Sequence, residues 1–180
     1  MFKKFITLAG FAAVAAGSAS QVSAQVSKGY SDIGVVVGVG NIGDANIAFG
    51  GRYENVFKRL PDFGNGLLGF HLSADVYTYG NNNNNNNNNA SIRVIPIGAT
   101  MNYHFPIDPA NKVDLFLGAG LGFNTISCSG FGSGGCGRNS ALYVIGRAGG
   151  RYFFSPRTAL YADLGAGAAT LNLGLTFKLK

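Results

Sequence analysis

Strict alternation of apolar and polar residues restricts the possible folds of this chain more than any other feature. In the C-terminal segment, every odd position from Leu171 to Leu179 is apolar, and the even positions from Thr170 to Lys178 are polar or glycine. Successive side chains of a strand point to opposite faces, so the segment predicts a strand with one apolar and one polar face. A soluble sandwich would turn the apolar face inward, whereas a membrane barrel would turn it toward lipid.

The same period of two recurs in seven further segments. They cover residues 31–39, 46–57, 68–77, 95–105, 113–124, 142–154 and 159–166. After the first 24 residues, no segment carries a sustained apolar stripe at helical spacing. Eight amphipathic strands of this length match the smallest membrane barrels.

The polar faces favour a barrel over a sandwich. They combine many small residues with charges of both signs, namely Asp32, Arg52, Glu54, Asp75, Asp114, Arg147, Arg151, Asp163 and Lys178. The lumen of an eight-stranded barrel is narrow, so it accepts small residues and paired charges. We therefore predict an all-β fold, an eight-stranded antiparallel up-and-down transmembrane β-barrel.

Specific contacts in the lumen follow from the expected strand order. We predict the ion pairs Arg151–Asp114 and Arg147–Asp163, and a second cluster that joins Arg52 and Glu54 near Asp75. Pro96 has no N–H to donate, and a closed barrel has no edge strand, so we expect a β-bulge at Pro96.

The first residues predict a secretory signal peptide. A cationic start, Met1-Phe2-Lys3-Lys4, precedes an uncharged, mostly apolar run from Phe5 to Ala16. Val22-Ser23-Ala24 fits a cleavage site before Gln25, and the run is too short to span a bilayer as a helix. The predicted organisation is a signal peptide over residues 1–24 and a barrel domain over 25–180, reached by secretion to the periplasm. The alternative is an uncleaved anchor.

Cys128 and Cys136 are separated by the polar, glycine-rich stretch Ser-Gly-Phe-Gly-Ser-Gly-Gly. In an oxidising compartment, two nearby cysteines most often form a disulfide, which is our prediction. A metal site is the alternative, but no His, Asp or Glu lies between or beside the two cysteines. We expect no metal.

Loop lengths and aromatic residues predict the orientation. If the first strand runs outward, the long connections 80–90 and 126–140 are external, as are 41–45 and 167–169, while 58–66, 106–112 and 155–157 are periplasmic. The tract Asn81–Asn89 is then a flexible external loop. Lipid-facing aromatics gather near the predicted periplasmic strand ends, as in a membrane girdle: Phe57, Phe70, Tyr103, Phe105, Tyr152, Phe154 and Phe177.

The C-terminal strand also carries a family resemblance. Asn172-x-Gly174-x-x-Phe177-x-Leu179 resembles the assembly signal of bacterial outer-membrane barrels, and "IPIGATMNYHF" is a weaker match. The chain resembles the small eight-stranded outer-membrane β-barrel superfamily, which includes the outer-membrane protein A transmembrane domain and the Ail/Opa-type surface proteins. The resemblance implies a barrel in the outer membrane of a Gram-negative bacterium that interacts with the barrel assembly machinery.

For function, we expect a monomeric, non-enzymatic barrel with surface loops and a structural or adhesion role. Its expected partners are outer-membrane lipid or lipopolysaccharide and a host or environmental surface ligand. No cofactor or catalytic residue is expected, and the scattered basic residues argue against nucleic-acid binding. One alternative is a narrow porin-like pore or a small-ligand-binding barrel, including a soluble lipocalin-like one.

A second alternative is a lipid A deacylase-like hydrolase, suggested by the pair His71-x-Ser73. Catalysis would require the His within hydrogen-bond reach of the Ser and an acidic residue that orients the His. The alternation instead predicts that both side chains point into the lumen, away from lipid.

Overall fold

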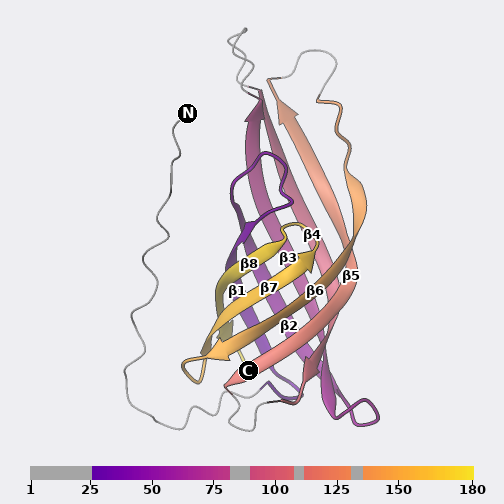
Figure 1. The fold of residues 1–180 in the computed structure, drawn as a ribbon, viewed down its shortest axis with the longest axis vertical. Helices are drawn as coiled ribbons and strands as arrows, with labels where there is room; N and C mark the ends of the chain where they lie inside the picture. The colour runs from indigo at the N-terminus through magenta and orange to yellow at the C-terminus, as the bar shows by residue number, and fades with distance from the viewer. Residues whose placement is uncertain (1–25, 82–89, 108–111, 131–135) are drawn as a thin grey trace, which may run out of the picture.

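The structure, a computed structural model, describes residues 26–81, 90–107, 112–130 and 136–180. They form one closed antiparallel barrel in which every strand pairs with its neighbours in the chain and the last strand pairs with the first (Figure 1). Its strands are β1 (Ser31–Val39), β2 (Ala48–Leu60), β3 (Gly66–Asn81), β4 (Ala90–Phe105), β5 (Val113–Ser129), β6 (Ala141–Phe153), β7 (Thr158–Ala166) and β8 (Leu171–Lys178).

The predicted all-β barrel is thus confirmed. The predicted signal peptide and most of the Asn81–Asn89 tract lie outside the described residues; Asn81 itself ends β3. No helix in the described ranges is long and apolar enough to span a membrane.

The alternation in the sequence becomes the difference between the two surfaces of the barrel wall. On β1, Val35 points outward and is 61% exposed, whereas Val36 points inward and is 3% exposed. The other strands follow the same rule, so a belt of exposed Ile, Leu, Val and Phe side chains surrounds a polar interior. A water-soluble protein rarely exposes an apolar surface of this extent, whereas a membrane barrel requires one.

The two ends of the barrel differ. We call the end that contains Ser31 and Lys178 the terminal end, and the opposite end the loop end. β3, β4 and β5 have 16, 16 and 17 residues, against nine, nine and eight in β1, β7 and β8. The three long strands therefore rise beyond their neighbours at the loop end (Figure 1). Pairing between β2 and β3 stops at Phe49–Val76, and pairing between β5 and β6 stops at Asn124–Ala141.

The polarity of the wall inverts in the projecting sheet, by which we mean the part of β3, β4 and β5 that rises beyond the neighbouring strands. Outward positions there are Thr78, Gly80, Ser91, Arg93, Thr125, Ser127 and Ser129. Inward positions carry a buried apolar cluster of Tyr79, Ile92 and Val94, against which Ala45, Tyr77, Ile126 and Cys136 pack. Polar-out and apolar-in is the pattern of a sheet in water, so the outer boundary of the apolar belt crosses β4 between Arg93 and Ile95.

The height of the belt matches a membrane. On β4 it runs from Ile95 to Phe105, roughly ten residue steps or about 34 Å of strand. A tilt of about 40° reduces this length to roughly 26 Å, close to the apolar band of outer-membrane barrels.

The inversion also explains why the predicted strands 68–77, 95–105 and 113–124 were too short. The alternation continues beyond Tyr77, before Ile95 and beyond Asn124, but with the opposite phase. The residues predicted as the loops 80–90 and 126–140 therefore include strand ends.

The bulge predicted at Pro96 is wrong. Both neighbours of β4 keep an unbroken register across Pro96; pairing with β3 skips Pro96 and Ile95 without a shift. The missing N–H therefore removes a ladder bond without adding a residue. The register shift lies instead in β2, between Val56 and Lys58, where the extra residue is Phe57.

Candidate functional site

An ionic layer built around Arg151 fills the lumen near the terminal end. The Arg151 guanidinium lies 2.9 Å from Asp32 (Nε to Oδ2) and 2.7 Å from Asp114 (Nη1 to Oδ2), and its Nη2 also donates a hydrogen bond to Glu54. All four side chains are at most 5% exposed. One planar guanidinium with five donors can bind three carboxylates that come from three different strands.

Two further residues complete this layer. The His104 ring lies 2.8 Å from Asp114 through Nδ1 and 2.9 Å from Glu54 through Nε2. Asn102 donates a hydrogen bond of 2.9 Å to Glu54 and accepts one from Thr100. Sequence reasoning placed His104 and Asn102 on the polar face of their strand but did not assign them to the charge network, because the depth at which strands align could not be read from the alternation.

A second ionic layer lies closer to the loop end. Arg52 pairs with Asp75 at 2.9 Å, and Arg147 pairs with Asp163 and donates a hydrogen bond to the Ala169 carbonyl. Asp163 also accepts a hydrogen bond from Tyr161.

The structure therefore brings together Arg151 with Asp114, Arg147 with Asp163, and Arg52 with Asp75. It does not place Glu54 near Asp75. Glu54 lies two residues closer to the terminal end than Arg52, at the depth of Arg151, so it joins the other layer.

Apolar groups seal the spaces around the two layers. At the terminal end, Tyr30, Val56, Leu67, Phe153 and Ala159 form a buried cluster beneath Arg151. Between the layers, the Phe116 and Tyr161 rings stack at 5.9 Å and both lie within 6 Å of the Arg151 guanidinium carbon. A cavity beside Arg52, His71 and Arg147 measures about 10 Å³, which is room for roughly one water molecule. The described lumen is a packed interior.

Glycines make room for these polar groups. A Cβ on Gly50 would lie 2.0 Å from Asp75 Oδ1, and one on Gly118 would lie 2.1 Å from Asn102 Oδ1. Larger residues at these positions would displace the polar side chains, so the glycines of the polar face are a steric requirement of the filled lumen.

The proposed hydrolase pair does not have catalytic geometry. His71 and Ser73 both line the small cavity inside the lumen. His71 is buried, and its Nδ1 lies 3.4 Å from the Thr100 hydroxyl, a long contact. In the described part of the chain no hydrogen bond joins the two residues or links His71 to a carboxylate, as an active Ser–His pair needs.

The cysteines lie at the loop end. Cys128 on β5 and Cys136 form the predicted disulfide. Cys136 packs on the projecting cluster, and the nearby Arg138 guanidinium lies 5.4 Å from the centre of the Tyr79 ring. The disulfide thus joins the segment that leads into β6 to the projecting sheet. Among the described residues, no group of three or more His, Cys, Asp or Glu side chains could hold a metal ion.

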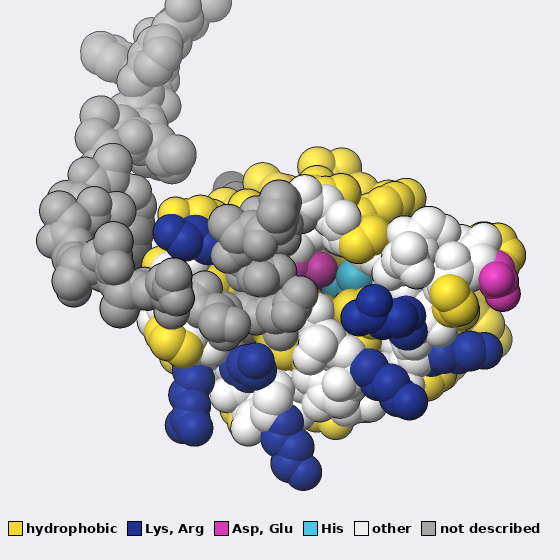
Figure 2. Space-filling view, turned by 90° about the horizontal axis from the view of Figure 1, so that it is seen from below, with side chains coloured by type: hydrophobic (Ala, Val, Ile, Leu, Met, Phe, Trp, Pro, Cys, Tyr) yellow, Lys and Arg dark blue, Asp and Glu magenta, His cyan; other side chains and the backbone are white. Residues whose placement is uncertain are grey.

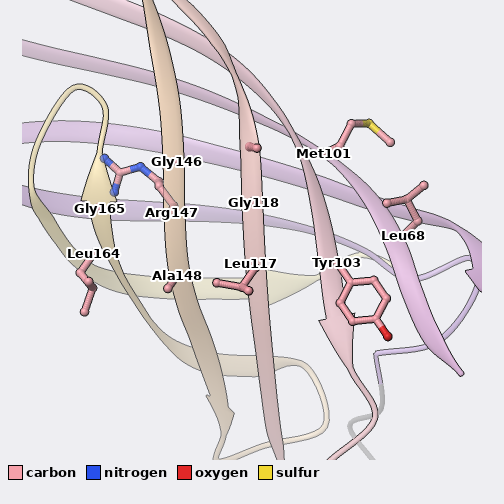
Figure 3. A pocket seen from close by; sticks show the side chains of 11 residues that line it. Leu68, Met101, Tyr103, Leu117, Gly118, Gly146, Arg147, Ala148, Leu164 and Gly165 are labelled. Carbon is pink, nitrogen blue, oxygen red and sulfur yellow. The ribbon is translucent and has the colours of Figure 1, made fainter. Parts of the chain in front are cut away.

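An open groove of about 490 Å³ lies on the outer surface of the wall (Figure 3). Its lining is mostly apolar and includes Leu68, Met101, Leu117, Ala148 and Leu164. Small residues on β6 produce it: a Cβ added to Gly146 would meet no atom within 4 Å. The groove opens onto the apolar belt.

The C-terminal motif occupies both faces of β8. Asn172 and Thr176 are buried in the lumen, and Asn172 donates a hydrogen bond to Asp163. Phe177 and Leu179 face outward. A Cβ on Gly174 would lie 2.0 Å from the Val35 carbonyl oxygen, so only glycine lets β8 close on β1 here.

Comparison with known proteins gives a fold but no sequence family. Neither protein-family models nor curated proteins match the sequence. Among solved structures, Ail, the attachment invasion locus protein of Yersinia pestis, is 14% identical with a TM-score of 0.53, over 85% of this chain and 100% of that chain. The N-terminal β-barrel domain of Pseudomonas aeruginosa OprF is 15% identical with a TM-score of 0.54, over 84% and 98%.

The chain shares their fold. The predicted resemblance in fold to such barrels is therefore confirmed. At these identities the likeness carries no residue roles and no ligand.

Proposed function

We propose that this protein is a non-enzymatic barrel of a Gram-negative outer membrane, with its terminal end in the periplasm and its loop end outside the cell. The observation that carries the proposal is the inversion of polarity along β3–β5. An apolar belt of bilayer height ends at a defined level, and above it a water-adapted sheet begins. The fold shared with Ail and OprF supports the same location.

Its role, in this proposal, is interaction through the projecting sheet. The sheet holds its own buried cluster, which keeps it rigid, and the disulfide attaches a loop segment to it. Recognition sites are commonly loops held on such a scaffold. A solved structure of Ail contains a heparin analogue, sucrose octasulfate. The loop end here presents only Arg93 and Arg138 against Asp44 among its described residues, so charge alone does not favour a polysulfated ligand.

The alternatives receive less support. A pore would need a continuous water path, whereas the two ionic layers and the apolar clusters fill the described lumen. A soluble small-ligand barrel would need an apolar interior, and this interior is charged. A hydrolase would need a Ser–His pair at the lipid surface, and His71 is buried in the lumen.

Whole-cell proteolysis combined with heat-modifiability tests this proposal. A folded membrane barrel resists detergent at low temperature and changes gel mobility on boiling. Trypsin added to intact cells after reduction of the disulfide should cleave at Arg138 and leave Lys58 and Arg59 uncut until the cells are broken. Cleavage at Arg59 in intact cells would reverse the orientation, and recovery in the periplasmic fraction without a mobility shift would remove the membrane assignment.

A further inference from the structure

The terminal end of the barrel carries an asymmetric charge. Its described basic residues, which we call the basic rim, are Lys28, Lys58, Arg59, Lys112, Arg157, Lys178 and Lys180. The one exposed acidic residue described at this end is Asp62; Asp32 and Asp114 are buried and bound to Arg151. Viewed from this end, basic side chains project at several points around the rim (Figure 2). The loop end has no comparable concentration in its described residues.

Three residues of the basic rim are available for an external partner. Lys58, Arg59 and Arg157 are exposed, and no salt bridge joins them to a carboxylate within the described ranges. Lys178 lies over the Tyr30 ring at 5.5 Å, where a cation can be held by the aromatic face. Among the described residues, the charges of Lys58, Arg59 and Arg157 are therefore left without a neutralising carboxylate.

The bulge in β2 turns one of these cations toward the bilayer. The register shifts between Val56 and Lys58, so that Phe57 and Lys58 both lie on the outer face. Lys58 pairs with the outward-facing Leu68. Without the shift, Lys58 would point to the lumen side. The bulge thus places Lys58 on the same outer face as its lipid-facing neighbour Phe57.

The depth of the rim matches that of lipid headgroups. Phe57, Tyr152, Phe154 and Phe177 are outward and 43–52% exposed at the same end of the barrel. Aromatic rings favour the interface between the hydrocarbon and the headgroups, and long Lys and Arg side chains just beyond it reach the phosphates. Basic clusters at such a surface attract anionic lipid.

We infer that the basic rim binds the headgroups of anionic phospholipids in the leaflet at the terminal end, with Lys58 and Arg157 as principal contacts. The inference rests on the proposed function, because it requires the apolar belt to lie in a bilayer. It adds a lipid class to the barrel: diacyl phospholipids with a net negative headgroup, such as phosphatidylglycerol. These contacts would hold the barrel at a fixed depth, because the phosphates lie at one level.

The test compares wild type with two charge-matched variants in lipid vesicles. K58Q/R157Q removes two positive charges from the basic rim, and R93Q/R138Q removes two from the loop end. Each protein is folded into phosphatidylcholine vesicles that contain a minor fraction of phosphatidylglycerol. Nitroxide-labelled phosphatidylglycerol or phosphatidylcholine then reports, by electron paramagnetic resonance, the fraction of each lipid held against the protein.

We expect wild type to prefer phosphatidylglycerol by about five-fold at low salt, since one well-placed cation contributes about that factor. High salt should weaken the preference. K58Q/R157Q should lose most of it, and R93Q/R138Q should retain it. No preference in wild type, or an equal loss in both variants, would overturn the inference.

Two parallel measurements distinguish failure of the lipid inference from failure of the proposed membrane barrel, and distinguish lipid binding from binding to the cell wall. Heat-modifiable folding in pure phosphatidylcholine without any lipid preference would remove only the lipid inference, whereas failure to insert there would remove the membrane barrel as well. Binding of detergent-folded wild type to purified peptidoglycan fragments, lost in K58Q/R157Q and without a lipid preference, would assign the rim to the cell wall instead.

Discussion

Arg151 on β6 and Glu54 on β2 form an ion pair across the lumen, although 97 positions separate them in the chain. Their strands are not neighbours in the barrel, so the contact is made through the interior rather than along the wall. The pair connects opposite sides of the barrel and forms part of the ionic layer around Arg151 near the terminal end.

Replacing Arg151 by methionine should be strongly destabilising. The substitution keeps a long apolar stem but leaves Asp32, Glu54 and Asp114 without their shared cation. Breaking a buried ion pair in this way typically costs about 3–5 kcal/mol. Urea titration in vesicles, followed by far-UV circular dichroism because the chain has no Trp, measures the free energy of unfolding. Arg157→Met on the rim is the matched control, and equal stability of the two variants would show that the layer is not needed for stability.

The Arg147–Asp163 pair should show energetic coupling. Arg147→Ala should lower the free energy of unfolding or open the lumen to ions, because it leaves a buried carboxylate. Adding Asp163→Ala should recover part of that loss. A complete double-mutant cycle, with planar-bilayer conductance as a second readout, measures the coupling. Losses that simply add would mean that the two residues act independently.

Two glycines on the same part of the wall should respond oppositely to alanine. A Cβ on Gly120 would lie 2.0 Å from the Ala99 carbonyl oxygen, whereas one on Gly146 would meet open space in the outer groove. Gly120→Ala should therefore cost roughly 1–3 kcal/mol through overpacking, and Gly146→Ala should be close to neutral. The fraction of heat-modifiable barrel in increasing urea provides the comparison. A tolerated Gly120→Ala would imply that β4 and β5 can separate locally.

The disulfide should stabilise the external segment rather than the barrel. Cys128 lies at the far end of β5, beyond the last pairing with β6, and Cys136 lies in the segment between β5 and β6. The double variant Cys128→Ser with Cys136→Ser should therefore fold with an unchanged mobility shift, while trypsin cleaves faster at Arg138. Loss of the shift would place the disulfide among the requirements for barrel assembly.

The number of strands and the direction of each face could be predicted because period-two patterns are local. The depth of each residue along the barrel axis was harder to predict, because the alignment of distant strands depends on the stagger of the whole barrel. Glu54 was therefore assigned to the Arg52 layer and His104 to none. The sequence predicts a bulge at Pro96 because proline lacks a backbone N–H. The bulge occurs instead at Phe57, where only the three-dimensional register of β2 and β3 reveals it. The projecting sheet was overlooked because its alternation has the opposite phase.

A nitroxide scan of β5 tests the central claim most directly. In the cysteine-free background, single labels at the odd positions from Leu115 to Ser129 report collision with oxygen, which concentrates in lipid, or with a water-soluble nickel chelate. The account predicts that oxygen dominates from Leu115 to Phe123 and that the nickel chelate dominates from Thr125 onward. A label at the even position Phe116, which faces the lumen, should be shielded from both. Uniform access of the nickel chelate to all the odd positions would contradict a membrane-spanning barrel.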